Sequence, residues 1–531
     1  MLLGSTARLL LLAAAMLFFS GAVNAEPDAP LAAALQTGSP SGASVDAAAM
    51  QSLRQFYEDR GNRYAWTSPD NGGEPNAAGR AVIAFLQTVS RDGLNPKAYT
   101  IPDTLRGTDA EMAIATALLR YSIDVRSGRV EPEKDDPELF RTRVAVDQTG
   151  ILRNAATGSE IEAFLETLAP RAVEYRALRE ALVAYRGMAE SGGWQPVPGI
   201  VTIKPGHAGP ELQPIWERLR ITGDIDRILP MPATYDDALV AGVMRFQRRH
   251  GLSPDGNIGP RTRAALNAPV SQRIRQIELN MERWRWLPDD LGETHVIVNL
   301  AGFDLRAVRR GEEVRKISVI VGRPYRRSPV FSDRISYLEL NPDWTVPYKI
   351  ATQDILPKLQ ADPGYLAENN FQVLPAGGGV PVDPASIDWT TYGRRNFPFL
   401  LRQLPGPTNA LGRIKFMFPN RFSVYLHDTP ARELFRQDVR MFSSGCIRVA
   451  EPMALAAFLL EGDPAWTPEA LQNVVDTGKT KVIRLRQTVP VHLTYQTAWV
   501  AADGTVQFRE DVYNRDTLLA AALFPAGNGH R

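Results

Sequence analysis

The single cysteine of the chain, Cys446, and a histidine upstream of it could do chemistry together. His427 precedes Cys446 by 19 positions (446 − 427), in the run Val424-Tyr425-Leu426-His427 whose alternation places Tyr425 and His427 on one face of a strand. An imidazole beside a thiol can take its proton, which lowers the pKa of the cysteine and leaves a nucleophilic thiolate next to an imidazolium. Taken alone, a buried inert cysteine and a structural histidine are the commoner cases. The combination favours catalysis.

The residues around Cys446 suit acyl transfer by a thiol. Gly445 has no side chain, so a substrate carbonyl can approach the backbone closely. Backbone N–H groups from Ser444 to Cys446 can stabilise a developing oxyanion. Arg448 favours the anionic sulfur if its guanidinium lies close. These residues are therefore candidates for lining a catalytic site.

Asp428 directly follows the candidate histidine. Its backbone carbonyl or its carboxylate could orient His427, as the partner of a catalytic imidazole commonly does. Alternatively, its side chain caps the turn that precedes Pro430. The sequence leaves these alternatives open.

The elements that must position these residues are strands. The hydrophobic period becomes two from about residue 295, and runs of this kind occur at 295–300, 316–321, 413–418, 422–427 and across 489–508. We predict a β-rich catalytic domain over residues 290–515 and a C-terminal tail over 516–531. A stretch rich in Pro, Gly and Asn interrupts the strands at 348–407, and we expect this insertion to cap the site and to move when substrate enters.

A mostly helical region comes earlier, at residues 49–200. Amphipathic stretches such as 79–86 and 112–119 predict helices with one buried face. Trp66 and Tyr121 are interpreted as core residues, because aromatic side chains are usually buried. We predict that this region is a scaffold.

A second helical unit is predicted at residues 209–268. Leu239, Val243 and Phe246 share one helical face, and Gly251 then ends that helix. A turn follows, and Pro260 begins the next helix. This pattern predicts a small three-helix module.

The N-terminus predicts export. Arg8 precedes an apolar run at 9–19, and Ala25 ends a stretch with the layout of a cleavable signal over residues 1–25. An uncleaved anchor is the alternative, although a membrane span needs about 20 apolar residues. Residues 26–48, rich in Ala, Pro, Gly and Ser, are predicted to be a flexible leader. We expect no stable membrane insertion after cleavage.

Composition and charge narrow the classes of function. Of the 531 residues, 44% are hydrophobic and 22% are charged, which is typical of a folded protein with several domains. A net charge of +1 gives no field to hold a polyanion, so we expect no nucleic acid partner. The six histidines lack metal-ligand spacing, and one cysteine cannot complete a usual zinc site, so neither metal nor cofactor is predicted.

Two signatures resemble known families. Phe-Gln-x-x-x-Gly-Leu from Phe246 and Asp-Gly-x-x-Gly-x-x-Thr from Asp255 resemble the small peptidoglycan-binding domain of many wall enzymes, the alternative being a packing module without a ligand. His-Asp-Thr-Pro from His427 and Ser-Ser-Gly-Cys-Ile-Arg-Val from Ser443 resemble the active-site signature of YkuD-type L,D-transpeptidases. Further runs at 321–324, 341–347 and 409–416 resemble the large subfamily with a helical scaffold, a peptidoglycan-binding domain and a capping insertion. Smaller members often have Gly or Ser after the histidine, so Asp428 leaves the histidine's partner open.

This resemblance implies a multidomain α+β fold: a mostly helical N-terminal scaffold, a small three-helix peptidoglycan-binding domain and a β-rich L,D-transpeptidase domain with a capping insertion. It implies that Cys446 attacks the third residue of a tetrapeptide stem, expels D-alanine and forms a thioester, which an amine of a second stem resolves into a 3→3 cross-link. His427 would be base and then acid, and Gly445 with Cys446 would hold the oxyanion. The remaining implied site residues are Ser444, Arg448, Tyr425 and Asp428.

Further expectations follow from the same resemblance. Asn341 and Trp344 could shape the donor groove, or could instead stabilise a corner of the fold. The implied partners are peptidoglycan stem peptides and cell-wall synthases, the implied location is the periplasm, and carbapenems should acylate the thiol. Two other functions stay open: a cysteine carboxypeptidase or amidase that passes the thioester to water, and a wall-binding scaffold without catalysis.

Overall fold

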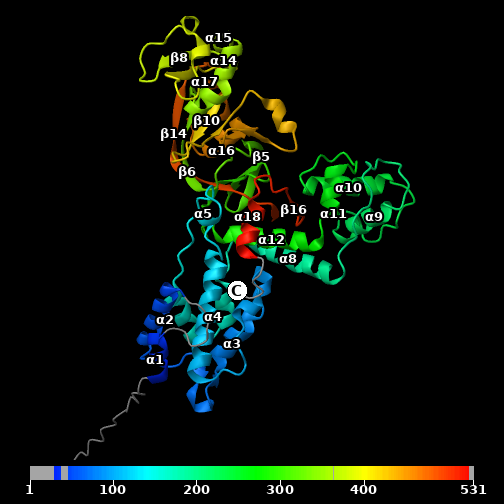
Figure 1. Ribbon diagram of the computed structural model, residues 1–531, viewed down its shortest axis with the longest axis vertical. Helices are drawn as coiled ribbons and strands as arrows, with labels where there is room; N and C mark the ends of the chain where they lie inside the picture. Colours follow the sequence, from blue (N-terminus) through cyan, green and yellow to red (C-terminus); the bar gives the residue numbers. More distant parts are fainter. Residues whose placement is uncertain (1–28, 38–45, 363, 526–531) are drawn as a thin grey trace, which may run out of the picture. The chain divides into compact units, whose positions relative to one another are not determined.

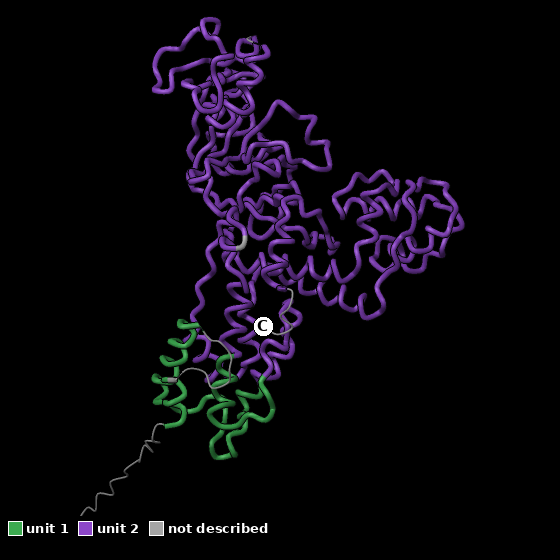
Figure 2. The backbone as a smooth tube through the Cα atoms, in the orientation of Figure 1, with its two compact units in different colours: residues 1–80, 101–116 green, residues 81–100, 117–531 purple. Residues whose placement is uncertain are grey.

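A computed structural model of the chain describes residues 29–37, 46–362 and 364–525. These residues form two compact units, coloured separately in Figure 2: one holds the described residues up to 80 together with 101–116, and the other holds 81–100 with 117–525. The predicted signal lies outside the described residues. Within the predicted leader, 26–48, the structure instead places a helix, α1 (Ala29–Thr37). The prediction of flexible chain is wrong there, because Leu31 and Leu35 lie one turn apart and are both buried.

A buried carboxylate organises the first unit. Its elements are α1, α2 (Ala47–Asp59), the antiparallel pair β1 (Thr67–Ser68) and β2 (Glu74–Pro75), and the first parts of α3 (Ala77–Leu86) and α4 (Gly107–Ser127). Glu111 on α4 is completely buried. Its carboxylate accepts hydrogen bonds of 2.5–3.0 Å from Tyr57 Oη, Ala65 N, Trp66 N and Thr67 Oγ1. Four donors stabilise a group that burial alone would disfavour.

Two long helices pack against each other in the second unit. Helix α8 (Val173–Glu190) buries one side chain every three or four residues, from Tyr175 to Tyr185. Helix α12 (Val270–Arg285) packs along it, and Arg186 of α8 donates to Glu278 of α12 at 2.8 Å. The shorter helices α5 (Pro132–Asp135), α6 (Gln148–Thr157) and α7 (Ile161–Glu166) complete this region. The predicted helical character is confirmed, and Trp66 and Tyr121 are both buried, as expected.

The three-helix module consists of α9 (Leu212–Ile221), α10 (Asp237–Arg249) and α11 (Pro260–Asn267). Leu239, Val243 and Phe246 lie in its separate hydrophobic core. Gln247 is also buried, and its side chain joins the turn to the helices. It accepts from Gly256 N at 2.9 Å and donates to Asp255 Oδ1 (2.9 Å), Asn257 O (2.9 Å) and Thr262 Oγ1 (3.2 Å). The polar residues of this sequence signature therefore bond with one another.

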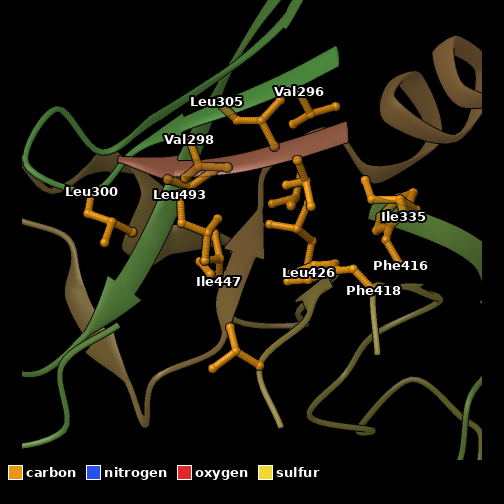
Figure 3. Packing of buried hydrophobic residues seen from close by; sticks show 14 of the residues in the cluster. Val296, Val298, Leu300, Leu305, Ile335, Phe416, Phe418, Leu426, Ile447 and Leu493 are labelled. Carbon is orange, nitrogen blue, oxygen red and sulfur yellow. The ribbon is translucent and has the colours of Figure 1, made fainter. Parts of the chain in front are cut away.

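The β-rich domain is a nine-stranded sheet in the order β12-β5-β13-β11-β10-β6-β14-β3-β4. Because β4 also pairs with β5, the sheet closes into a barrel from which only β12 branches. The strands are β3 (Thr294–Asn299), β4 (Asp304–Arg309), β5 (Glu312–Gly322), β6 (Ser332–Leu340), β10 (Ile414–Met417), β11 (Leu426–His427), β12 (Met441–Ser443), β13 (Ile447–Val449) and β14 (Lys481–Thr494). Figure 3 shows Leu426 and Ile447 among the apolar side chains that fill its interior.

Strand β11 is shorter than the run at 422–427 predicted. Ser423 has a φ of +54°, in the left-handed region, where a strand cannot continue. The Asn420 side chain stabilises this turn by donating to Phe418 O at 2.6 Å and to Val424 O at 2.8 Å. The strand therefore begins only at Leu426.

The insertion has its own sheet and its own core. Strands β7 (Trp344–Thr345), β9 (Phe399–Gln403) and β8 (Phe371–Pro375) pair in that order, labelled in part in Figure 1. Its helices are α13 (Tyr348–Ile350), α14 (Leu356–Ala361) and α15 (Tyr365–Glu368), with a π-helical turn at Ala351–Ile355. Trp389, Phe397 and Leu401 are among the residues buried in this core. The segment is thus a small folded body and not an irregular loop.

The C-terminal part of the described chain is folded. After α16 (Pro452–Leu459) and α17 (Pro468–Asp476), β15 (Ala498–Val500) pairs with β16 (Val506–Phe508), and α18 (Arg515–Leu523) follows. Leu519 and Leu523 join the hydrophobic core of the barrel domain. The predicted tail at 516–531 is therefore wrong over α18. Among the described helices, none combines the length and the apolar character needed to cross a membrane.

Candidate functional site

The paired strands β11 and β13 place the candidate side chains. They run parallel, with Leu426 opposite Ile447 and His427 opposite Arg448. Because Leu426 and Ile447 point into the barrel core, alternation turns Tyr425, His427 and Arg448 to the other side of the sheet. The rings of Tyr425 and His427 lie 5.6 Å apart, which confirms the predicted shared face.

Cys446 directly precedes β13 and is half-buried. Its thiol donates a hydrogen bond to Ser423 O at 3.8 Å, and the Tyr425 side chain lies close enough to lower the pKa of the thiol. Burial among the surrounding protein atoms raises the pKa of the thiol, and this effect outweighs the opposing hydrogen bonds of Tyr425 and the positive charges of Lys415 and Arg448. The resting cysteine is therefore a neutral thiol near pH 7.

His427 is buried and neutral. Burial, followed by the positive charges of Arg448 and Lys415, lowers the pKa of its imidazole to about 3. Nδ1 donates to the backbone oxygen of Asp428 at 2.5 Å, which leaves Nε2 as the proton acceptor. Within the described part of the chain, no hydrogen bond joins this imidazole to Cys446. The thiolate–imidazolium pair expected from the sequence is absent at rest, because both groups would have to carry charge in a desolvated place.

The carboxylate of Asp428 has a structural task. Its Oδ2 accepts from Arg413 N at 2.8 Å, and its Oδ1 pairs with Arg432 Nη2 at 2.8 Å. A Cβ on Gly412 would lie 2.4 Å from this carboxylate, so the turn before β10 is fitted closely around it. Of the alternatives left open by the sequence, the structure shows the backbone carbonyl as the partner of His427.

The chain beside the cysteine is held by serine hydroxyls. Gly445 has a φ of +122°, which favours glycine, and its N–H donates to Ser443 Oγ at 3.2 Å. Ser443 Oγ in turn donates to Cys446 O at 2.5 Å, and Ser328 Oγ donates to Gly445 O at 2.7 Å. The Gly445 N–H, expected to hold an oxyanion, is therefore engaged at rest. Of the expected pair of donors, only the Cys446 N–H lacks an acceptor among the described residues.

Ser444 links this chain to the insertion. Its Oγ accepts from Arg326 Nη1 at 2.9 Å. The guanidinium of Arg326 also donates to Gln353 Oε1 at 2.8 Å and pairs with Asp354, whose Oδ1 lies 3.0 Å from Nη2. Gln353 and Asp354 belong to the π-helical turn of the insertion. Sequence reasoning missed Arg326 and Ser328, which lie in a loop far from Cys446 in sequence.

The two groove candidates differ. Asn341 is buried at a φ of +45°, and its Nδ2 donates to the carbonyls of Val474 (3.0 Å), Val475 (3.1 Å) and Lys479 (3.2 Å). It therefore satisfies the C-terminal end of α17 and is not a groove residue, because its amide has no hydrogen left for a ligand. Trp344 is half-buried in β7 and lies close enough to Tyr425 to lower the pKa of that phenol, so it does lie beside the site.

Lys415 is a site residue that the sequence analysis did not single out. It lies opposite His427 in the pairing of β10 with β11, and its Nζ is 4.6 Å from the centroid of the Tyr425 ring. Nζ also lies 3.7 Å from Glu339 Oε2. Alternation within the run at 413–418 could have placed Lys415 on the polar face, had its partner strand been known.

Other described histidines serve the fold. Nδ1 of His295 bonds Gly292 O at 2.7 Å, and Nδ1 of His492 bonds Ser332 Oγ at 2.6 Å. Among residues 29–37, 46–362 and 364–525, no three His, Cys, Asp or Glu side chains gather as metal ligands would.

Three family descriptions match the chain. Residues 51–182 match "Scaffold domain", 208–266 match "Putative peptidoglycan binding domain" and 293–475 match "L,D-transpeptidase catalytic domain". A curated protein of Haemophilus influenzae called "Putative L,D-transpeptidase" is 38% identical over 252 residues, which are 48% of this chain and 50% of that protein. The chain thus spans half the length of this relative.

Solved L,D-transpeptidases are also similar. One from Xylanimonas cellulosilytica is 16% identical, with 56% of this chain and 98% of that chain covered and a TM-score of 0.18. One from Mycobacterium smegmatis is 11% identical, with 38% and 58% covered and a TM-score of 0.17. Scores this low do not bear on the fold, so the assignment rests on the matched domains. The chain contains a scaffold domain, a peptidoglycan-binding domain and the catalytic domain of the YkuD L,D-transpeptidases.

Proposed function

We propose that the protein is an L,D-transpeptidase that forms 3→3 peptidoglycan cross-links through a thioester on Cys446. The observation that supports this proposal is the sheet face shared by Tyr425 and His427, whose rings lie 5.6 Å apart, with Tyr425 close enough to the Cys446 thiol to affect its pKa. The substrates would be tetrapeptide stems, and the site of action would be the periplasm. Wall synthases are the proposed suppliers of those stems.

In the first step, Nε2 of His427 takes the thiol proton while Sγ bonds to the carbonyl carbon of the third stem residue. The amide bond to the terminal D-alanine breaks, and the imidazolium gives its proton to the leaving amine. In the second step, a side-chain amine of another stem attacks the thioester and loses a proton. The thiolate leaves and is protonated again, so that the thiol and the neutral imidazole are restored.

The electrostatics assign a role to the cations. Since both Cys446 and His427 are neutral at rest, the ion pair forms only as substrate arrives. Arg448 and Lys415 lie close enough to lower the pKa of the thiol, so they stabilise the thiolate once it forms. A positively charged lining also suits the carboxylate of the terminal D-alanine.

The oxyanion has two candidate donors. The first is the Cys446 N–H. The second is the phenol of Tyr425, which burial keeps protonated by raising its pKa and which lies close enough to Cys446 for the two groups to affect each other's pKa. The Gly445 N–H would join them only if its bond to Ser443 Oγ opened.

We also propose that the insertion caps the donor stem. Its contact with the Cys446 segment runs through Arg326, which bonds Ser444 and the pair Gln353 and Asp354. Opening this contact would admit substrate, as lids do in other enzymes. Arg326→Ala should therefore change the KM for the tetrapeptide donor. Its effect on the free energy of unfolding should be smaller.

The decisive experiment incubates disaccharide-tetrapeptides with the wild type and with Cys446→Ala and identifies the products by mass spectrometry. The expected result is a 3→3 linked dimer with the wild type and no product with the variant. If only disaccharide-tripeptide formed, water would be the acceptor and the protein would be a carboxypeptidase. If Cys446→Ala retained cross-linking, the cysteine mechanism would be wrong.

Labelling the thiol with a carbapenem gives an independent test. Intact mass should rise by one drug molecule in the wild type and stay unchanged in Cys446→Ala. Ser444→Ala, which removes the hydroxyl next to the thiol, is the matched control and should still form the adduct. An adduct that required Ser444 and not Cys446 would contradict the assignment.

A further inference from the structure

The sequence signature of the three-helix module does not provide its ligand surface. Gln247, Asp255, Gly256 and Thr262 bond with one another, and Phe246 lies in the core. These groups hold the turn against the helices. A ligand of the module must therefore be recognised mainly by other residues.

A cavity of about 470 Å³ lies where the module meets α12, β16 and α18. Figure 1 shows α12, β16 and α18 grouped on one side of α11. Part of its wall is small and apolar, with Ala264, Ala265 and Ala268 on one side and Leu279 and Phe508 on the other. Walls of this kind fit the faces and the N-acetyl groups of sugar rings.

Hydrogen bonds hold the walls together. Gln276 Nε2 on α12 donates to Thr497 O and to Arg509 O, each at 2.9 Å. Arg509 Nη1 donates to Arg249 O of the module at 3.0 Å. The cavity is therefore built from fixed backbone on each side.

Arginine side chains dominate the polar part of the lining. Arg261, Arg273, Arg275 and Arg509 contribute four guanidinium groups. Arg273 and Arg509 are largely enclosed, and burial lowers the pKa of each to about 10, so both still carry charge near pH 7. Arg275 is exposed and lies 4.0 Å from the centroid of the Phe524 ring.

The carboxylates of the lining are engaged elsewhere. Asp511 accepts from Tyr495 Oη at 2.7 Å and from backbone N–H groups at the start of α18. Asp516 pairs with Arg283 at 2.6 Å. Only Glu510 faces a lining arginine, with its Oε1 3.4 Å from Nε of Arg261. The cavity therefore has an excess of positive charge.

Two buried polar atoms in the lining have no partner in the described structure. They are Nε2 of His250 and Nε of Arg273, in side chains that are 5% and 7% exposed. Nδ1 of His250 donates to Phe246 O at 2.8 Å, so Nε2 carries a lone pair that can accept a hydrogen bond. Buried polar atoms are normally satisfied, so this donor and this acceptor are both available to a ligand.

We propose that this cavity binds the carboxylated, N-acetylated glycan strand of peptidoglycan, with arginines holding the carboxylate, alanines contacting the N-acetyl group and His250 accepting from an N–H or hydroxyl. The proposal rests on the proposed function, because it assumes a wall substrate. The site is separate from Cys446, and it would hold the enzyme at stretches of glycan that carry no stems, because a stem occupies the lactyl carboxyl group as an amide.

The test uses glycan strands stripped of stem peptides, which keep the lactyl carboxylate but offer nothing to the thiol. Binding to the full-length protein is measured by calorimetry. Ala264→Phe should fill the cavity and Arg275→Glu should reverse a charge at its edge, each weakening binding about tenfold or more. The matched control is Arg227→Glu, an equal charge reversal at an exposed position of the three-helix module outside the lining, which should bind like the wild type.

Each outcome of this experiment either supports or overturns the proposal. Equal binding by wild type and Ala264→Phe, or undiminished binding of strands whose carboxylates have been converted to amides, would overturn the proposal. Cys446→Ala should bind stripped strands like the wild type while losing turnover. Turnover by the wild type is read separately with soluble disaccharide-tetrapeptides, so failure of the catalytic proposal would show there and not in glycan binding.

Discussion

The barrel domain and the three-helix module each carry a recognisable signature, and the two signatures do different things. In the barrel, His427 and Cys446 keep their reactive atoms free of strong internal hydrogen bonds. In the module, Gln247 and its partners satisfy one another and are closed to a ligand. A signature can therefore mark either a reaction or a fold, and hydrogen bonding tells the two apart.

The largest effect should follow removal of the candidate base. His427→Ala should lower kcat/KM for tetrapeptide donors by about 10³-fold, because a positioned general base contributes about 10²–10⁴-fold. Product formation is followed by chromatography of muropeptides. His207→Ala, in a half-exposed histidine whose ring pairs with Glu211 at 3.2 Å, should act like the wild type. An active His427→Ala would place the base elsewhere.

Disrupting the sequence signature of the three-helix module should lower the stability of that module and not the rate of the reaction. Gln247→Ala leaves several buried groups without partners and should destabilise the module by about 2–4 kcal/mol. Hydrogen exchange over residues 209–268 measures this locally. The exposed Gln213, which only donates to Glu217, provides the control, and Gln213→Ala should change stability by less than about 0.5 kcal/mol. Unchanged protection in Gln247→Ala, together with lost wall binding, would make the signature a ligand site after all.

The effect of pH on kcat/KM should be smaller than the effects of these substitutions. The effect of pH on folding stability should differ from its effect on kcat/KM. With the pKa of His427 near 3 and that of Cys446 raised, neither group titrates near pH 6.5, so kcat/KM should vary less than about threefold between pH 6 and 8.5. Stability should behave differently, because unfolded His427 takes a proton below its ordinary pKa of 6.5 while the folded form stays neutral to about 3. Acidification through this window therefore favours unfolding. A sharp rise in kcat/KM centred on pH 6.5 would contradict the neutral site.

The smallest effect is expected at Asp428. Asp428→Asn keeps the backbone carbonyl that orients His427, so kcat/KM should change by no more than about twofold. The exposed side chain of Arg432 would lose its ion pair, which should cost less than about 1 kcal/mol. Steady-state kinetics and thermal unfolding measure the two effects. A hundredfold loss of activity at unchanged stability would show that the carboxylate takes part in catalysis.

Local patterns predicted much of this molecule. Alternation placed Tyr425 and His427 on one face, and the helical period located the core of the module through Leu239, Val243 and Phe246. Both depend only on residues close in sequence. The multidomain α+β fold class, which the family resemblance implied and the helical and strand periods supported, is confirmed.

What stayed hidden depends on contacts between distant segments. Arg326 and Ser328 reach the Cys446 segment across more than a hundred residues, and no spacing rule connects them. The sequence allowed two interpretations of Asn341, and only the structure shows that its side-chain amide bonds the C-terminal end of α17. The neutral state of Cys446 depends on how many atoms surround it, and a sequence does not give that number.

The neutral thiol also bears on survival of the enzyme between turnovers. Peroxides oxidise thiolates far faster than thiols, and sulfinic and sulfonic acids would be irreversible losses. A catalytic cysteine that becomes anionic only against a bound stem is therefore protected from oxidants while it waits. Under the proposed mechanism, the burial that raises the pKa of Cys446 would make its reactivity conditional on substrate.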